Sequence, residues 1–128
     1  MSYTLTRSIA DSSFDATVAR TREALAEQGF GVLTEIDVKA TLKKKLDADV
    51  DDYLILGACN PTMAHQAMQM EPRIGAMLPC NVILRKVDNA VEVSAIDPVA
   101  SMAAVDNDDL KTVAGQVREM LQKVVDSI

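Results

Sequence analysis

Aromatic residues are nearly missing from this chain: its 128 residues include two Phe, two Tyr and no Trp. Single-stranded nucleic acids are held partly by stacking bases on aromatic side chains, and this protein has few of them. Positive charge is also scarce, because 13 Lys and Arg stand against 19 Asp and Glu, which gives a net charge of −6. Since phosphate backbones are bound through clustered Lys and Arg, the composition argues against a nucleic-acid partner.

Long apolar runs are missing as well. No stretch of the sequence approaches the roughly 18–20 apolar residues of a membrane-spanning helix. The first ten residues do not follow the charged, apolar, small-residue order of a secretory signal. We therefore expect a cytoplasmic protein with no membrane partner. A chain of 128 residues has room for one domain, which we place at residues 1–128.

The hydrophobic pattern predicts an alternation of strands and helices. Period-two and continuous apolar segments predict strands at residues 3–9, 30–37, 53–59, 81–87 and 90–97. Helical spacing predicts helices at residues 14–28 and 38–46, after residue 60, and around residues 110–124. The order β-α-β-α-β-α-β-β-α predicts an α+β fold, a two-layer domain with a mixed sheet of about five strands. Gly115 weakens the last helix, so we expect it to mark the close approach of another element.

The last two strands form the most specific structural prediction. The pair Asp88-Asn89 tolerates the positive φ angles of a two-residue hairpin turn, which fixes the register. Val87 is then expected opposite Ala90, and Arg85 opposite Glu92 as an exposed ion pair. The residues expected to share the core face are Val82, Leu84, Val93 and Ala95.

The candidate functional residues lie where the predicted strand at 53–59 ends. Asn60 is a favoured N-cap residue and Pro61 fits the first helical position, so a helix is expected to begin directly after Cys59. Unpaired N–H groups and the helix dipole at such a start favour a thiolate. Cys80 begins the next strand and comes close to Cys59 if the two strands are neighbours. With two cysteines the chain builds no disulfide scaffold, and both are expected as free thiols.

Three other interpretations apply to this region. The commoner role of free cysteines is that of small buried hydrophobic residues, and this alternative applies to both of them. His65 is a candidate base or co-ligand for Cys59, although a solvent-facing helical histidine is the commoner case. Methionines between the cysteines, with the thiols, suit soft Cu or Zn ligation, but methionines at helical spacing usually fill a core; they are Met63, Met68, Met70 and Met77. The motifs of P-loop, dinucleotide-binding, nucleophile-elbow and HExxH proteins are absent, so no catalytic residue is assigned.

Several motifs in order resemble the Domain of Unknown Function 302 family. The resemblance rests on the segments at 29–32, 34–38, 58–61, 78–82 and 94–98, together with Ala64, Ala67, Pro72 and Gly75. The family commonly has Gly after the Lys-Leu pair that ends the second helix, where this chain has Asp47. The resemblance implies an α+β fold and a homodimer. It also marks as motif positions Cys59, Asn60, Pro61, Leu78, Pro79, Cys80 and Asn81.

These observations predict a small domain that binds a thiol-reactive or anionic small ligand, or senses redox state, at Cys59 and Cys80. The alternative is a non-catalytic homodimeric interaction module with structural cysteines. A soft-metal protein that binds Cu or Zn is the least favoured interpretation.

Overall fold

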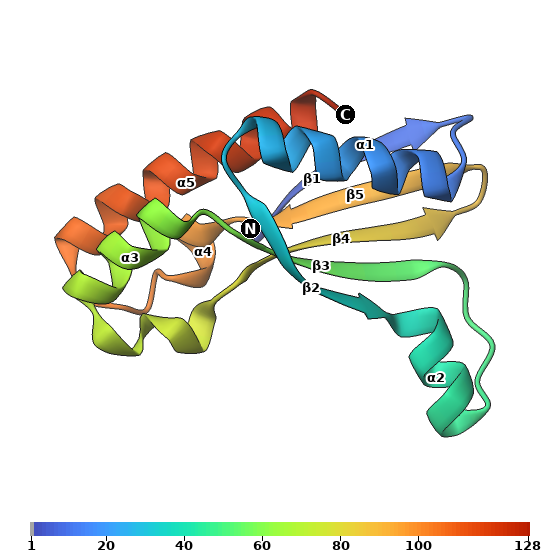
Figure 1. Cartoon of the computed structure of the whole chain (residues 1–128), viewed down its shortest axis with the longest axis horizontal. Helices are drawn as coiled ribbons and strands as arrows, with labels where there is room; N and C mark the ends of the chain where they lie inside the picture. The colour runs from blue at the N-terminus through green and yellow to red at the C-terminus, as the bar shows by residue number, and fades with distance from the viewer. Residues whose placement is uncertain (1) are drawn as a thin grey trace.

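The helices and strands follow the predicted order in the computed structural model, which describes residues 2–128 (Figure 1). The strands are β1 (Thr4–Ala10), β2 (Gly31–Asp37), β3 (Tyr53–Cys59), β4 (Cys80–Val87) and β5 (Ala90–Ile96). The helices are α1 (Phe14–Glu27), α2 (Val38–Leu46), α3 (Pro61–Met70), the 3₁₀ helix η1 (Pro72–Met77), α4 (Pro98–Ser101) and α5 (Asp108–Asp126). The predicted α+β class with five strands is confirmed.

The sheet has the strand order β1-β5-β4-β3-β2, and each neighbouring pair is antiparallel. The prediction of a mixed sheet is therefore wrong. Two consecutive strands can pair in parallel only if the connection between them crosses back to the end at which the first strand began. Here α2 and the α3–η1 segment stand between strands that are antiparallel neighbours, and the α1 connection leads from one edge strand to the other. Alternating strands and helices in the sequence do not reveal that difference.

The hairpin between β4 and β5 has the predicted register. Val87 pairs with Ala90 and Arg85 with Glu92, and Asp88 in the turn has a φ of 54°. The Nε atom of Arg85 donates to Oε1 of Glu92 at 2.8 Å. The predicted core residues of this hairpin, Val82, Leu84, Val93 and Ala95, are all fully buried.

Helices α1 and α5 cover one face of the sheet and form the second layer (Figure 1). The apolar face of α5 is buried because its apolar residues recur every three or four positions; its buried residues are Leu110, Val113, Ala114, Val117, Leu121, Val124 and Val125. Gly115 has no atom within 4 Å of the position that a Cβ would take. The expected close approach at Gly115 is therefore wrong.

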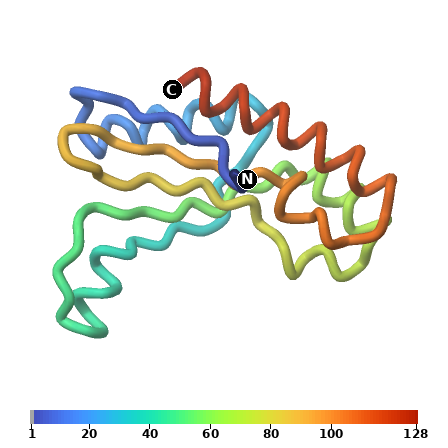
Figure 2. The backbone as a smooth tube through the Cα atoms, turned by 180° about the vertical axis from the view of Figure 1, so that it is seen from behind, coloured from blue at the N-terminus to red at the C-terminus, as the bar shows by residue number. Residues whose placement is uncertain are grey.

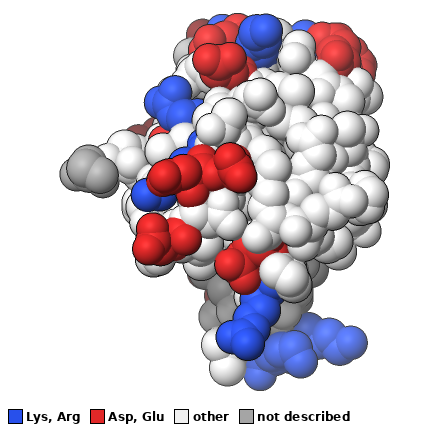
Figure 3. All heavy atoms as spheres, turned by 90° about the vertical axis from the view of Figure 1, so that its left-hand side faces the viewer, with Lys and Arg blue, Asp and Glu red and all other residues white. Residues whose placement is uncertain are grey.

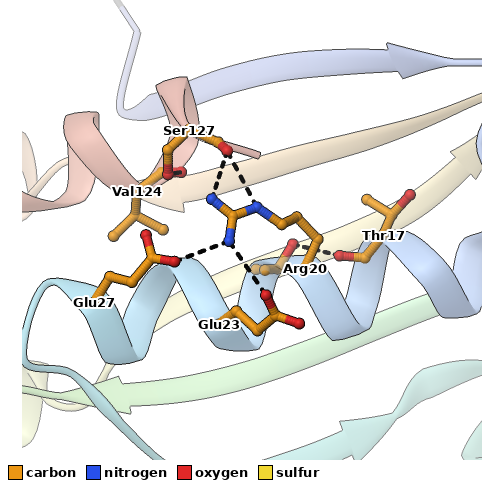
Figure 4. Close-up of polar contacts among 7 residues, drawn as sticks. Thr17, Arg20, Glu23, Glu27, Val124 and Ser127 are labelled. Atoms are coloured by element: carbon orange, nitrogen blue, oxygen red, sulfur yellow. Dashed lines mark hydrogen bonds and ion pairs between the residues drawn. The ribbon is translucent and has the colours of Figure 1, made fainter.

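Two arginines from α1 and β1 form hydrogen bonds with backbone carbonyls after the C-terminal end of α5. Arg20 of α1 donates to the Ser127 carbonyl oxygen from Nε at 3.2 Å and from Nη2 at 2.8 Å (Figure 4). Its Nη1 atom lies 3.0 Å from a carboxylate oxygen of Glu27. From β1, Arg7 donates to the Ile128 carbonyl oxygen at 2.7 Å. Positive charge at a helix C-terminus pairs with the last free carbonyls and with the helix dipole.

The second face of the sheet is not covered by any helix of residues 2–128. Seen from behind, the strands lie in front of α1 (Figure 2). Helix α2 stands away from both layers and has no buried residue. Within the described part of the chain, no helix has both the length and the apolar character needed to cross a membrane.

Candidate functional site

The candidate site begins at the predicted junction of β3 and α3. Cys59 is the last residue of β3, and Pro61 is the first residue of α3. Asn60 is the N-cap, because its Oδ1 atom accepts from the Met63 backbone N–H at 3.2 Å. The cap explains why the helix starts at once after a buried strand.

The strand register places Cys80 diagonally across from Cys59. Cys80 pairs with Ala58, while Cys59 pairs with Gly31 of β2. Side chains alternate between the two faces of a sheet along each strand. Because the two cysteines are offset by one residue, their side chains leave the sheet on opposite faces. Both cysteines are free. Side chains that start from opposite faces of a sheet are poorly placed for a direct disulfide.

Both cysteines nevertheless line one small cavity between the end of the sheet and the helices. The cavity has a volume of about 30 Å³. Four residues of the predicted site line it, namely Cys59, Asn60, Leu78 and Cys80. None of the described residues in its wall carries a charge. The cavity therefore suits a neutral apolar group.

The two cysteines differ in exposure. Cys80 is buried, with 7% of its surface exposed, while Cys59 is partly exposed. Burial raises the pKa of the Cys80 thiol from 9.0 to about 11, and the nearby Cys59 adds to this increase. A thiol with such a pKa stays protonated at neutral pH, which makes Cys80 a weak nucleophile. Of the two residues, Cys59 is the more exposed.

The remaining predicted site residues lie outside the cavity wall. Pro61 is exposed at the start of α3. The ring of Pro79 lies over Gly57, with its Cγ atom 2.8 Å from the position that a Gly57 Cβ would take. Pro79 and Asn81 line a separate surface hollow together with Leu78. Six of the seven motif positions thus line the cavity or this hollow, Leu78 lines both, and Pro61 lines neither.

Of the other candidates of the sequence, only Met63 lines the cavity. His65 is exposed on α3. Of the four methionines considered as soft-metal ligands, Met63 lines the cavity, while Met68, Met70 and Met77 are exposed. Among residues 2–128, no three His, Cys, Asp or Glu side chains are grouped closely enough to hold a metal ion.

Much of the cavity wall comes from helices far away in the sequence. The residues that sequence patterns did not connect with the thiols are Phe30, Pro98, Met102, Leu110, Val113, Ala114 and Val117. Asn60 also contacts α5, since its Nδ2 atom lies 3.8 Å from Sδ of Met120. The amphipathic pattern of α5 indicates burial, but it does not tell which part of the sheet the helix covers.

Part of the end of the molecule that holds the cavity carries no charged side chain (Figure 3). Helix α3 contains no acidic residue and no Lys or Arg. Figure 3 shows a broad area without charged side chains on the end that carries α3 and α4.

Fold and cavity together define a class of small two-layer α+β proteins with a five-stranded antiparallel sheet and thiols at the end of that sheet. A solved structure with this fold is that of the uncharacterized conserved protein DUF302 from Bacillus stearothermophilus. It is 23% identical to this chain, with a TM-score of 0.93 over 99% of this chain and 98% of that one. The family model for the domain of unknown function DUF302 matches residues 5–128, and the chain belongs to that family. No functionally curated protein matches the sequence.

Proposed function

We propose that the protein carries a small neutral group on the sulfur of Cys59, held in the apolar cavity beside α3. The observation that supports this proposal is that a partly exposed and a buried cysteine line one cavity. Chemically, the ligand is a thiol-reactive species that attaches to Cys59. A reducing compartment such as the cytoplasm would keep Cys59 available as a free thiol.

Charge favours a neutral group over the anionic ligand that the helix start alone indicates. The cavity wall has no positive side chain among the described residues. The Met63 N–H at the helix start is already bound by Asn60. An anion in this wall would lose its hydration without a counter-charge, which is costly.

The cavity volume limits the size of the group. One water molecule needs roughly 10–15 Å³ of such space. A cavity of about 30 Å³ therefore holds a group of two or three heavy atoms. A drug-sized ligand needs several hundred Å³ and does not fit without movement of the helices.

Cys80 contributes an apolar wall in this proposal. Its thiol stays protonated because burial raises its pKa to about 11. The register offset also disfavours a disulfide between Cys80 and Cys59, because the two side chains start from opposite faces of the sheet. A group bound to Cys59 is therefore protected from attack by the neighbouring sulfur.

Two methanethiosulfonate reagents of different charge test the proposal. Methyl methanethiosulfonate transfers a neutral S-methyl group: the Cys59 thiolate attacks the sulfenyl sulfur, a mixed disulfide forms, and methanesulfinate leaves with the electron pair of the broken S–S bond. The thiol proton goes to solvent. The 2-sulfonatoethyl analogue reacts by the same step but transfers an anionic group. The ratio of the two rate constants, measured by mass spectrometry of the intact protein, reports the selectivity of the cavity.

For Cys59, we expect the ratio of the neutral to the anionic rate constant to be at least about ten-fold higher in the native protein than in the protein unfolded in guanidinium. This difference corresponds to about 1.4 kcal/mol. Cys59→Ser removes the fast reaction, whereas Cys80→Ala retains it. Equal neutral-to-anionic ratios in the folded and unfolded protein would refute the proposal, and so would faster labelling of Cys80 than of Cys59.

The second candidate function is a homodimeric interaction module in which the cysteines only pack. The observation that favours it is the uncovered face of the sheet, on which Ile36 is 48% exposed. Contiguous apolar surface of this kind marks an interaction site. Sedimentation equilibrium of the full chain tests it, with a mass of twice 13.8 kDa expected. A monomer at all concentrations would exclude this function and leave the cavity proposal untouched.

A further inference from the structure

Alanines from two helices line the cavity beside Cys59. Helix α3 contributes Ala64 and Ala67. Helix α5 contributes four residues whose spacing places them on one face of the helix, namely Leu110, Val113, Ala114 and Val117. Ala114 is the smallest of these four and is 3% exposed. Because protein interiors are closely packed, a longer side chain at Ala114 would occupy space that now belongs to the cavity.

The wall that residues 2–128 form offers a bound group little hydrogen bonding. Apart from the two cysteines, its one residue with a polar side chain is Asn60. The Asn60 side chain accepts from the Met63 N–H at 3.2 Å and donates to Sδ of Met120 at 3.8 Å. Within this part of the chain, no buried side-chain nitrogen or oxygen lacks a hydrogen-bond partner. A carbonyl or hydroxyl group in the cavity would lose its water without replacement, which favours a hydrocarbon group.

We infer that Cys59 takes up a short unbranched alkylthio group from a small disulfide, and that Val113 and Ala114 limit its length; the inference rests on the proposed function and names its substrate class. The cavity of about 30 Å³ holds two or three heavy atoms. An ethylthio group consists of one sulfur and two carbons and reaches this limit, whereas a butylthio group exceeds it.

Thiol–disulfide exchange attaches such a group without help from an acid or base, and none of the described wall residues other than the cysteines can serve as one. The Cys59 thiolate attacks the sulfur that carries the alkyl chain. A new S–S bond forms as the old one breaks, and the other half of the disulfide leaves as a thiolate, which takes a proton from solvent. One disulfide is exchanged for another, so no further oxidant or reductant is needed.

Two substitutions on α5 are expected to move the size limit in opposite directions. Ala114→Val adds two carbons to the wall and leaves room for about one heavy atom. Val113→Ala removes two carbons at a side chain that is 6% exposed and makes room for about five heavy atoms, because a core refills such a space only partly. The matched control is Ala19→Val, since Ala19 is exposed on α1 and the change in helix propensity is the same.

The size limit is tested by exchange with the peptide of residues 57–60, which carries the same cysteine without a cavity. The peptide is prepared as its ethylthio or its butylthio mixed disulfide and incubated with each full-length protein to equilibrium. Mass spectrometry gives the equilibrium constant for transfer of each group to the protein, and fragmentation identifies the modified cysteine. Circular dichroism checks that each protein is folded.

For the wild-type protein, we expect the transfer constant of the ethylthio group to exceed that of the butylthio group at least about ten-fold, because the longer chain overpacks the cavity. Ala114→Val is expected to lower the ethylthio constant about ten-fold, and Val113→Ala to raise the butylthio constant about ten-fold. Ala19→Val is expected to leave both constants within about two-fold of the wild-type values.

Equal constants for the two groups in the wild-type protein would overturn the inferred substrate class. Changes in the α5 variants no larger than in Ala19→Val would overturn the roles of Val113 and Ala114, and Val113→Ala decides alone if Ala114→Val does not fold. The neutral-to-anionic ratio at Cys59 tests the proposed function separately, because both alkyl groups are uncharged. A retained charge ratio with equal alkyl constants refutes this inference and leaves the proposed function standing.

Discussion

Alkaline pH is expected to destabilise the protein through one residue, Cys80. Its pKa in the folded protein is raised from 9.0 to about 11 by burial. Below pH 9 the thiol is protonated in both the folded and the unfolded chain, so it adds no pH dependence. Between pH 9 and 11 the unfolded chain loses this proton while the folded protein keeps it, and the free energy of unfolding falls.

The size of this loss follows from the difference between the two pKa values. Each unit corresponds to about 1.4 kcal/mol, so the full effect is on the order of 2 kcal/mol by pH 11. That is a large share of the roughly 5–15 kcal/mol that stabilises a typical domain. The cause lies in the fold, since Cys80 is 7% exposed at the start of β4.

Urea unfolding at about pH 8 and about pH 10.5 measures the effect. Lysines and tyrosines also titrate in this range, but they do so equally in a variant, so the comparison with Cys80→Ala isolates the thiol. The wild-type protein is expected to lose more stability between the two pH values than Cys80→Ala or Cys80→Ser, neither of which has a thiol at this position. Equal losses in all three proteins would refute the claim that Cys80 is held as a buried neutral thiol.

Three further substitutions test details of the fold by thermal or urea unfolding. Gly57→Ala is expected to destabilise the protein by about 1–3 kcal/mol, because the new methyl group would overlap Thr34 Oγ1 and the ring of Pro79; unchanged stability would contradict this close packing. Gly115→Ala is expected to stabilise it by about 0.5–1 kcal/mol, since nothing lies within 4 Å of the new Cβ and alanine favours the helix; a loss would show an undetected contact. Asp47→Gly is expected to stabilise it by about 0.5–1 kcal/mol, because Asp47 has a left-handed φ of 53° at the C-cap of α2; a lower melting temperature would contradict the strain.

Local signals in the sequence predicted what depends on near neighbours. The Asp88-Asn89 turn gave the correct register of β4 and β5, because a two-residue loop leaves one pairing. Asn60 and Pro61 gave the start of α3, because capping involves only the next three residues. The family pattern, which has Gly where this chain has Asp47, agrees with the left-handed backbone at that position.

Contacts between residues far apart in the sequence could not be predicted from these local signals. The pairing of β1 with β5 joins residues 80 to 92 positions apart, and without it the antiparallel sheet could not be distinguished from a mixed one. The cavity was missed for the same reason, since α5 supplies Val113 and Ala114 to a wall that also contains Cys59 and Cys80. The sequence did locate the thiols at one end of the sheet. Their offset by one residue emerged only from the register of β3 with β4.

The central proposal is that a small group on Cys59 lies inside the cavity, and its position can be measured directly. Reaction of the native protein with ¹³C-methyl methanethiosulfonate would place one labelled methyl group on Cys59. We predict nuclear Overhauser effects from this methyl to the side chains of Met63 and Ala114, which line the same cavity. A methyl signal with random-coil shift and no such effects would show that the group points into solvent, and would contradict the account.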